Sequence, residues 1–168
     1  MFRKVSLFLG LFFLLSFTAH AQDKVEIFGG YSYLRLDLSP APSSVNLNGW
    51  EASGQYKVTS WLGGVADFSG DYGSIAGVGT QFHTFLFGPQ ISWPARVSPF
   101  AHVLVGGAHI SGGGASDTAF ASALGGGIDA KITDRFYWRL IQGDYLLSRF
   151  GDHTQNNARI SSGIVFRF

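Results

Sequence analysis

The chain has 168 residues, enough for one ordinary domain, and carries a formal net charge of +1. It contains no cysteine, which excludes disulfide bonds, thiolate metal ligands and cysteine nucleophiles. Charged residues make up only 14% of the chain and aromatic residues 15%, the reverse of a disordered composition. The small net charge gives no electrostatic basis for binding nucleic acid.

The first 21 residues have the layout of a secretory signal peptide. Arg3 and Lys4 form a basic start, residues 5–17 are almost wholly apolar, and Ala19-His20-Ala21 provides a small-x-small cleavage site. The apolar run is about 13 residues, short of the roughly 20 that a transmembrane helix needs. We therefore expect residues 1–21 to be removed and residues 22–168 to form the mature domain.

Apolar and polar residues alternate along the rest of the chain, which is typical of β-strands. Between residues 50 and 58, for example, the even positions are Trp, Ala, Gly, Tyr and Val, whereas the odd positions are Glu, Ser, Gln and Lys. Eight such segments are predicted as strands, over residues 25–36, 47–58, 61–72, 80–92, 99–110, 119–131, 135–146 and 157–168. In the seventh, Gln142 and Asp144 share a face that Arg139 does not, so we expect a β-bulge near Gly143.

The segments between the predicted strands alternate in length. Short connections lie at 59–60, 93–98 and 132–134, and longer ones, rich in Gly, Ser, Asp, Asn or Pro, lie at 37–46, 73–79, 111–118 and 147–156. This order predicts an all-β fold, a closed antiparallel up-and-down barrel of eight strands with tight turns at one end and longer loops at the other.

The composition of the polar faces indicates whether the apolar or the polar side of the strands points outward from this barrel. A soluble lipocalin-like barrel buries its apolar face, whereas a transmembrane barrel turns that face to lipid. The polar faces are poor in Lys and Glu and rich in Gly, Ser and Ala, unlike a solvated surface. Aromatic residues cluster near the predicted strand ends, as in the girdles of transmembrane barrels. The pattern favours a transmembrane β-barrel with its polar face inside.

The carboxy-terminal segment resembles the terminal signal of bacterial outer-membrane barrels. Ile160, Ile164, Phe166 and Phe168 match its alternating apolar positions and final aromatic residue, and Ser162 departs from it. Residues 25–33 and 66–70 also resemble the small eight-stranded group that includes the opacity-type and OmpA-like barrels. The resemblance implies a place in the outer membrane of a Gram-negative-type bacterium, contact with its lipid, periplasmic turns and external loops. It also implies the outer-membrane assembly machinery as a partner.

Charged residues on the inward faces are the strongest candidates for a site. Glu51, Asp67, Asp129 and Arg159 are expected to form a polar network in the lumen, because an unpaired buried charge costs several kcal/mol. Ser53, Gln55, Ser161 and either Arg139 or Asp144 are expected to join this network. Glu26, Lys131 and Arg167 are expected to lie at the solvated ends of the barrel. His102 alternates with apolar neighbours, which favours a hydrogen-bonding role in the lumen.

Motifs for chemistry are absent from the sequence. It contains no HExxH metal motif and no GxSxG nucleophile elbow, and no helical pattern follows its glycine clusters. We therefore expect no cofactor, no metal and no catalytic residues, and a non-enzymatic protein with a structural or surface-interaction role through its external loops. Two alternatives stay open at this point: a channel for small solutes, and a soluble periplasmic lipocalin-like binder.

Overall fold

The computed structural model describes residues 24–38, 43–150 and 153–168, and the predicted signal peptide lies outside them. Eight strands make up the fold: β1 (Val25–Asp37), β2 (Ser44–Lys57), β3 (Leu62–Ile75), β4 (Val78–Ser92), β5 (Val97–Gly112), β6 (Ala115–Lys131), β7 (Phe136–Phe150) and β8 (His153–Arg167). The described residues include no helix that is long and apolar enough to cross a membrane.

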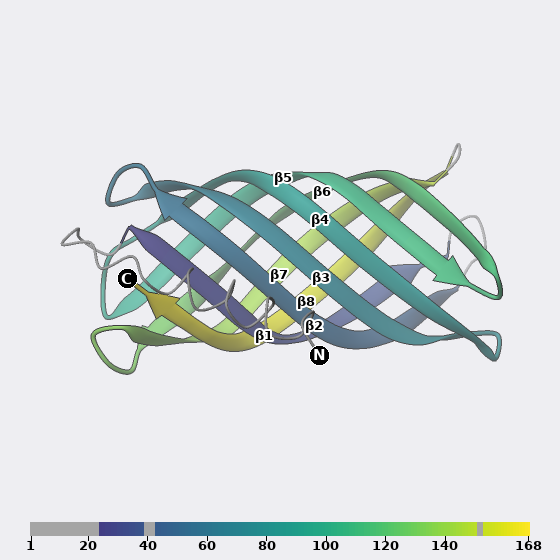
Figure 1. Cartoon of the computed structure of the whole chain (residues 1–168), viewed down its shortest axis with the longest axis horizontal. Coiled ribbons are helices and arrows are strands. Elements are labelled where there is room, and N and C mark those ends of the chain that lie inside the picture. Colours follow the sequence, from purple (N-terminus) through teal and green to yellow (C-terminus); the bar gives the residue numbers. More distant parts are fainter. Residues whose placement is uncertain (1–23, 39–42, 151–152) are drawn as a thin grey trace, which may run out of the picture.

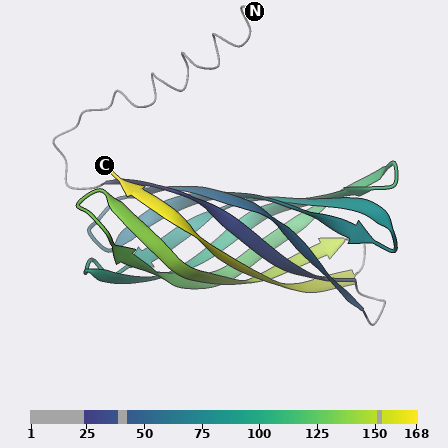
Figure 2. The same cartoon turned by 90° about the horizontal axis from the view of Figure 1, so that it is seen from below.

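The strands form one closed barrel, which confirms the predicted fold class. Each strand pairs antiparallel with the next, and β8 pairs antiparallel with β1 to complete the ring (Figures 1 and 2). If the paired residues are followed from Leu34 across β8 and once around the barrel, they lead back to Lys24, the residue before β1, ten residues away from the start. This stagger is the reason that the strands are tilted against the barrel axis in both views.

The two ends of the barrel differ in their connections. We call the end that holds Phe168 and the connections 58–61, 93–96 and 132–135 the turn end, and the opposite end the loop end (left and right in Figure 1). Two of the turns share a hydrogen-bond pattern: the hydroxyl oxygens of Thr59 and Thr133 each accept a backbone N–H three residues ahead, from Leu62 and Phe136. Both turns begin with the same kind of sequence, Lys-(Val or Ile)-Thr at residues 57–59 and 131–133, so the same local hydrogen bonding forms them.

Strand bounds at the loop end correct the predicted ones. Most of the residues in the predicted loops 73–79, 111–118 and 147–156 belong to strands, which run on to Ile75, Gly112 and Phe150. The connections 76–77 and 113–114 have positive φ at both residues, 50° and 82° in the first and 61° and 84° in the second. Such two-residue turns match the twist of paired strands, so the hairpins continue to their tips. Residues 39–42 and 151–152 lie outside the described residues.

A bulge in β7 explains the mixed facing of that strand. The pairing of β7 with β8 shifts register between Arg139 and Gln142, two to three residues before the position predicted at Gly143. Leu140 and Ile141 are both exposed on the outside of the barrel. Because these two adjacent residues both face outward, the alternation shifts by one residue at this point. Arg139, Gln142 and Asp144 therefore all face the interior.

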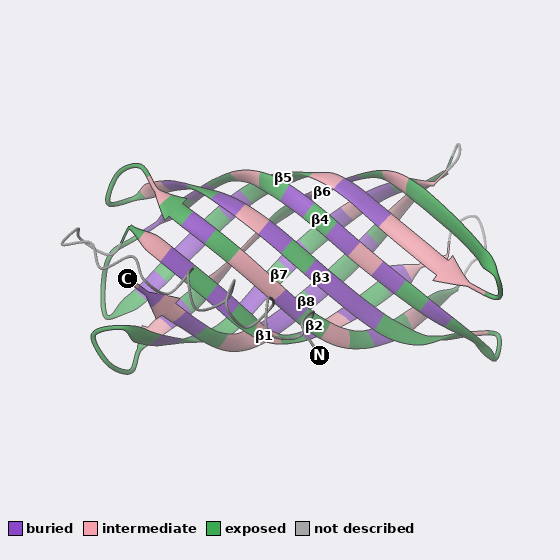
Figure 3. Cartoon of the chain, in the orientation of Figure 1, coloured by how far each residue is buried: buried purple, intermediate pink, exposed green. Residues whose placement is uncertain are grey.

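The outer wall is apolar and the interior is mixed. Along each strand buried and exposed residues alternate (Figure 3), and the exposed ones include many large apolar and aromatic side chains. Inside, buried polar groups line the bore from the turn end into the loop-end half, where they include Asp71, Ser148 and Asn157, and an apolar cluster packs among them toward the loop end. The cluster includes Leu34, Leu36, Leu47, Phe82, Leu86, Leu104 and Leu146.

Candidate functional site

Arg159 on β8 is the centre of the polar interior. Its guanidinium lies 3.4 Å from Glu51 on β2, 3.0 Å from Asp67 on β3 and 2.7 Å from Asp144 on β7. None of these four side chains is more than 1% exposed. Three carboxylates from three strands therefore converge on one cation, and their burial makes each ion pair depend on the others.

Neutral groups complete the hydrogen bonding of this cluster. The Gln142 amide donates to Glu51 at 2.7 Å and to Asp144 at 2.9 Å, and the Ser161 hydroxyl donates to Glu51. His102 Nε2 lies 2.7 Å from Asp144 Oδ1, and its other ring nitrogen lies 3.3 Å from Gln90 Oε1. The imidazole of His102 thus takes part in the buried hydrogen-bond network of the lumen.

Asp129 belongs to a second cluster, near the turn end. Arg139 donates to both of its carboxylate oxygens, at 2.8 and 3.3 Å, and Arg167 lies 3.3 Å away. Arg167 also lies 2.8 Å from Glu26, which in turn pairs with Lys57. The structure therefore brings Glu51, Asp67 and Arg159 together but separates Asp129 from them.

Arg139 connects the two clusters. Its Nη1 donates to Gln142 Oε1 at 2.7 Å, while the amide nitrogen of Gln142 donates into the Arg159 cluster. The guanidinium carbon also lies 4.3 Å from the ring centroid of Phe28 and 4.2 Å from that of Phe100. Aromatic faces on both sides favour the charged group, so Arg139 is held by hydrogen bonds and by cation–π contacts.

Little space is left among these side chains. A cavity beside Ser53, Gln55 and Gln90 has a volume of about 10 Å³, close to that of a single water-sized probe. Within the described residues, no group of three His, Asp or Glu side chains is placed to hold a metal ion. The observed geometry ties β2, β3, β7 and β8 together through buried ion pairs and joins β5 to them through the hydrogen bond between His102 and Asp144.

The apolar cluster at the loop end was missed by sequence reasoning. Leu34 and Leu36 share inward parity with Glu26 and Ser32, so the alternation of the first strand did contain the signal. Together these leucines and their partners from the other strands fill part of the lumen toward the loop end, beside buried polar residues such as Asp71 and Asn157.

The carboxy-terminal residues lie where β8 meets β1 and β7. Ile160 and Ile164 are exposed on the outer wall, and Phe166 stacks between Phe136 and Phe168 with centroid distances of 5.0 and 5.3 Å. Phe168 exchanges two backbone hydrogen bonds with Val25, at 2.9 and 3.0 Å. These two bonds complete the closure of the barrel at the turn end.

Comparison with known proteins gives matches only at the level of structure. No family model and no curated protein matches the chain. Neisserial surface protein A superimposes with a TM-score of 0.73 at 11% identity, over 86% of this chain and 97% of that one. The attachment invasion locus protein Ail of Yersinia pestis gives 0.58 at 18% identity, over 87% and 100%. The amino-terminal barrel domain of Pseudomonas aeruginosa OprF gives 0.52 at 13% identity, over 87% and 98%.

The chain has the fold of the small eight-stranded outer-membrane β-barrels. The resemblance that the sequence suggested is thereby confirmed for the architecture. At identities of 11–18% the likeness concerns the fold, and the interior clusters described above are properties of this chain.

Proposed function

We propose that this protein is an integral outer-membrane barrel without enzymatic activity, which acts structurally or through surface interactions at its loop end. The observation that carries the proposal is the filled interior: buried ion pairs occupy the middle of the barrel, and leucines packed with buried polar side chains occupy the loop-end half. A bore filled by side chains leaves the outer wall and the two ends as the surfaces on which the protein can act.

The outer wall supports a place in lipid. Exposed apolar residues surround the barrel, including Ile91, Val103, Leu124, Ile160 and Ile164. Tyr72 and Phe120 lie toward the loop end of this surface, and Trp61, Trp93 and Trp138 toward the turn end. Aromatic bands at two levels are typical of the two interfaces of a membrane. A leader over residues 1–21 would deliver the chain for export, and the assembly machinery would then insert it.

The loop end supports the surface-interaction role. The hairpins β3–β4 and β5–β6 form a groove of about 350 Å³ between them, lined by Ile75, Val78 and Ile110 among others. Val78, at the tip of the β3–β4 hairpin, is exposed and placed for contact with a partner beyond the wall that faces lipid, whereas Ile75 and Ile110 pack against the apolar cluster. One structural neighbour, the attachment invasion locus protein Ail, is named for attachment, which agrees with this proposal.

Two measurements on cells test the proposal. An epitope inserted between Gly113 and Gly114, at the tip of β5–β6, is expected to bind antibody on intact Gram-negative host cells. Cells that display the protein are expected to adhere to cultured epithelial cells better than empty-vector cells, and the substitution Val78→Asp at an exposed position is expected to remove the gain. Staining only after permeabilisation would contradict the orientation. Equal adhesion with and without the protein would contradict the interaction role and leave the structural one.

A further inference from the structure

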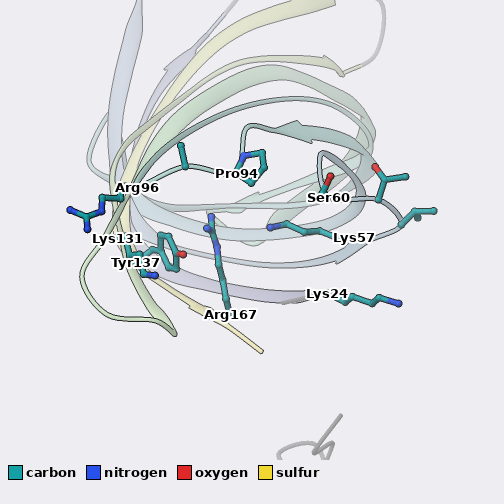
Figure 4. A pocket seen from close by; sticks show the side chains of 11 residues that line it. Lys24, Lys57, Ser60, Pro94, Arg96, Lys131, Tyr137 and Arg167 are labelled. Carbon is teal, nitrogen blue, oxygen red and sulfur yellow. The ribbon is translucent and has the colours of Figure 1, made fainter. Parts of the chain in front are cut away.

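The turn end carries an excess of positive charge around the mouth of the barrel. A depression of about 590 Å³ is lined there by five basic residues: Lys24, Lys57, Arg96, Lys131 and Arg167. Figure 4 shows the charged ends of Lys57 and Arg167 inside the mouth, whereas those of Lys24 and Arg96 lie on opposite sides of it and point outward. This end therefore presents basic side chains from several strands and turns.

Not all of these charges are used within the protein. Lys57 and Arg167 pair with Glu26, and Lys131 pairs with the exposed Asp134. Among the residues that the structure describes, no acidic side chain forms an ion pair with Lys24 or Arg96. Two cations at the mouth thus remain available to a ligand with negative charge.

The turn that carries Arg96 is held in place by its own hydrogen bonds. The Trp93 amide donates to the Pro99 carbonyl at 2.9 Å, and the Ser98 hydroxyl donates to the Ala95 carbonyl at 2.7 Å. The Lys131 amide donates to the Arg96 carbonyl at 2.8 Å, which fixes this turn to the end of β6. A fixed backbone lowers the entropy that is lost when the Arg96 side chain binds an anion.

An apolar groove of about 730 Å³ lies beside the basic mouth. Trp61 and Trp93 line it together with Ile91, Pro99 and Ala101, which are all exposed on the outer wall. Ser60 and Pro94 line both the groove and the mouth, so one short stretch of rim separates a cationic surface from an apolar one. Figure 4 shows these two residues along one side of the mouth.

We propose that the turn end binds a phospholipid with a net negative headgroup, its phosphate at the turn that holds Pro94 and Arg96, and an acyl chain in the Trp61–Trp93 groove. A ligand that satisfies both surfaces needs an anionic group joined to hydrocarbon, which a free phosphate does not supply. The groove also continues the apolar outer wall, where acyl chains are the solvent. This site lies at the opposite end from the surface-interaction groove and is independent of it.

Native mass spectrometry of the folded protein tests the proposal. The protein is released from detergent micelles that contain equal amounts of phosphatidylglycerol and phosphatidylcholine, and the bound lipids are counted. The wild type is expected to retain phosphatidylglycerol in preference. Arg96→Gln is expected to lower that preference about fivefold, because a basic residue near an anionic lipid surface contributes about 1 kcal/mol. Arg96→Lys keeps the charge and is expected to keep most of the preference.

Matched variants separate the two halves of the site. Trp93→Ala is expected to reduce retention of both lipids, whereas Trp138→Ala, an exposed tryptophan at the same end outside the groove, leaves it unchanged. Arg149→Gln, an exposed arginine toward the loop end, is the control for Arg96. Equal retention of the two lipids by the wild type would overturn the proposal. So would displacement of phosphatidylglycerol by glycerol 3-phosphate, or an equal loss in Arg149→Gln and Arg96→Gln.

Discussion

Asp144 Oδ1 lies 2.7 Å from His102 Nε2, although β6 separates their two strands. The residue of β6 between them is Gly125, which pairs with Asp144 on one side and with His102 on the other. A Cβ atom at position 125 would overlap Asp144 Oδ1 and would lie 2.6 Å from the Gly143 carbonyl oxygen. The missing side chain therefore provides the space in which the carboxylate and the imidazole meet.

Gly125→Ala is expected to destabilise the folded barrel. The added methyl group displaces Asp144 from His102 and disturbs its pairing with Arg159, and overpacking of this kind costs about 1–3 kcal/mol. Unfolding by urea in lipid vesicles, followed by tryptophan fluorescence, measures the change. Gly143→Ala is the matched control, because a Cβ there has no atom within 4 Å. Equal midpoints for the two variants would show that the space at Gly125 is not needed.

Arg159→Met is expected to cost more than any other single loss of charge in the interior. The substitution leaves Glu51, Asp67 and Asp144 buried without their shared cation, and removal of one partner from a buried ion pair costs about 3–5 kcal/mol. Folded yield and the free energy of unfolding are the measurements. Adding Asp67→Asn to Arg159→Met is expected to restore part of the stability, since one fewer carboxylate repels the rest. Arg149→Met, which removes an exposed arginine, is expected to behave as the wild type.

Facing was predictable from the sequence because a strand has a fixed period of two. In β8 the inward series Arg159, Ser161 and Arg167 and the outward series Ile160 and Ile164 follow directly from their positions. The burial of Glu51 and Asp67 follows in the same way from their parity with Gln55 and Val65. Alternation thus fixes the side of the wall on which each residue lies, given a closed barrel.

The partners of these residues were not predictable from alternation. The height of a residue along the barrel axis depends on the stagger between strands, and this stagger is fixed only when the barrel closes. Asp129 therefore pairs with Arg139 and Arg167 rather than with Arg159. The bulge in β7 changes parity within a strand and brings Arg139 inside together with Asp144. The strand bounds at the loop end depended on two-residue turns, and Ala76 at φ 50° carries no sequence signal of such a turn.

Ile164→Arg is expected to destabilise the barrel in lipid according to depth. The side chain is exposed on the outer wall, and an arginine facing lipid costs about 2–4 kcal/mol near the bilayer midplane and about 0–1 near an interface. Thr154→Arg lies on the same outward series of β8 but near the loop end, so its cost is expected to be smaller. Unfolding titrations in phospholipid vesicles measure both. Equal costs at the two positions would contradict the assignment of β8 to a membrane-spanning wall.

Phe168→Asp is expected to lower the amount of barrel assembled in the outer membrane. Phe168 packs on Phe166 and exchanges backbone hydrogen bonds with Val25, where β8 closes on β1. Carboxy-terminal aromatic residues also belong to the assembly signal that the segment resembles. Detergent-resistant, heat-modifiable protein in membrane fractions is the measurement, and Phe120→Asp on the opposite part of the wall is the comparison. Normal assembly of Phe168→Asp would remove the basis for assigning the signal to Ile160, Ile164, Phe166 and Phe168.

The purified, folded barrel is expected not to conduct ions steadily. Water-filled porins use about 16–18 strands, whereas eight strands enclose an interior just wide enough for side chains to fill. Here the Arg159 cluster spans the middle of the bore, with Asp144, Glu51 and Gln142 bonded across it. Leu34, Leu36 and their neighbours pack across the lumen nearer the loop end. An ion crossing the barrel would have to separate buried ion pairs and pass between packed leucine side chains.

Planar-bilayer recording of the refolded protein measures this directly. Rare, small and flickering events are the expected result for the wild type, because only transient rearrangement of the interior can open a path. Asp144→Ala together with Glu51→Ala removes two of the carboxylates that cross the bore but leaves the packed leucines in place. This variant is therefore expected to stay closed as well, which distinguishes a barrier that includes these leucines from a purely electrostatic one. Large, stable steps that scale with salt in most wild-type insertions would contradict the closed lumen and favour a channel.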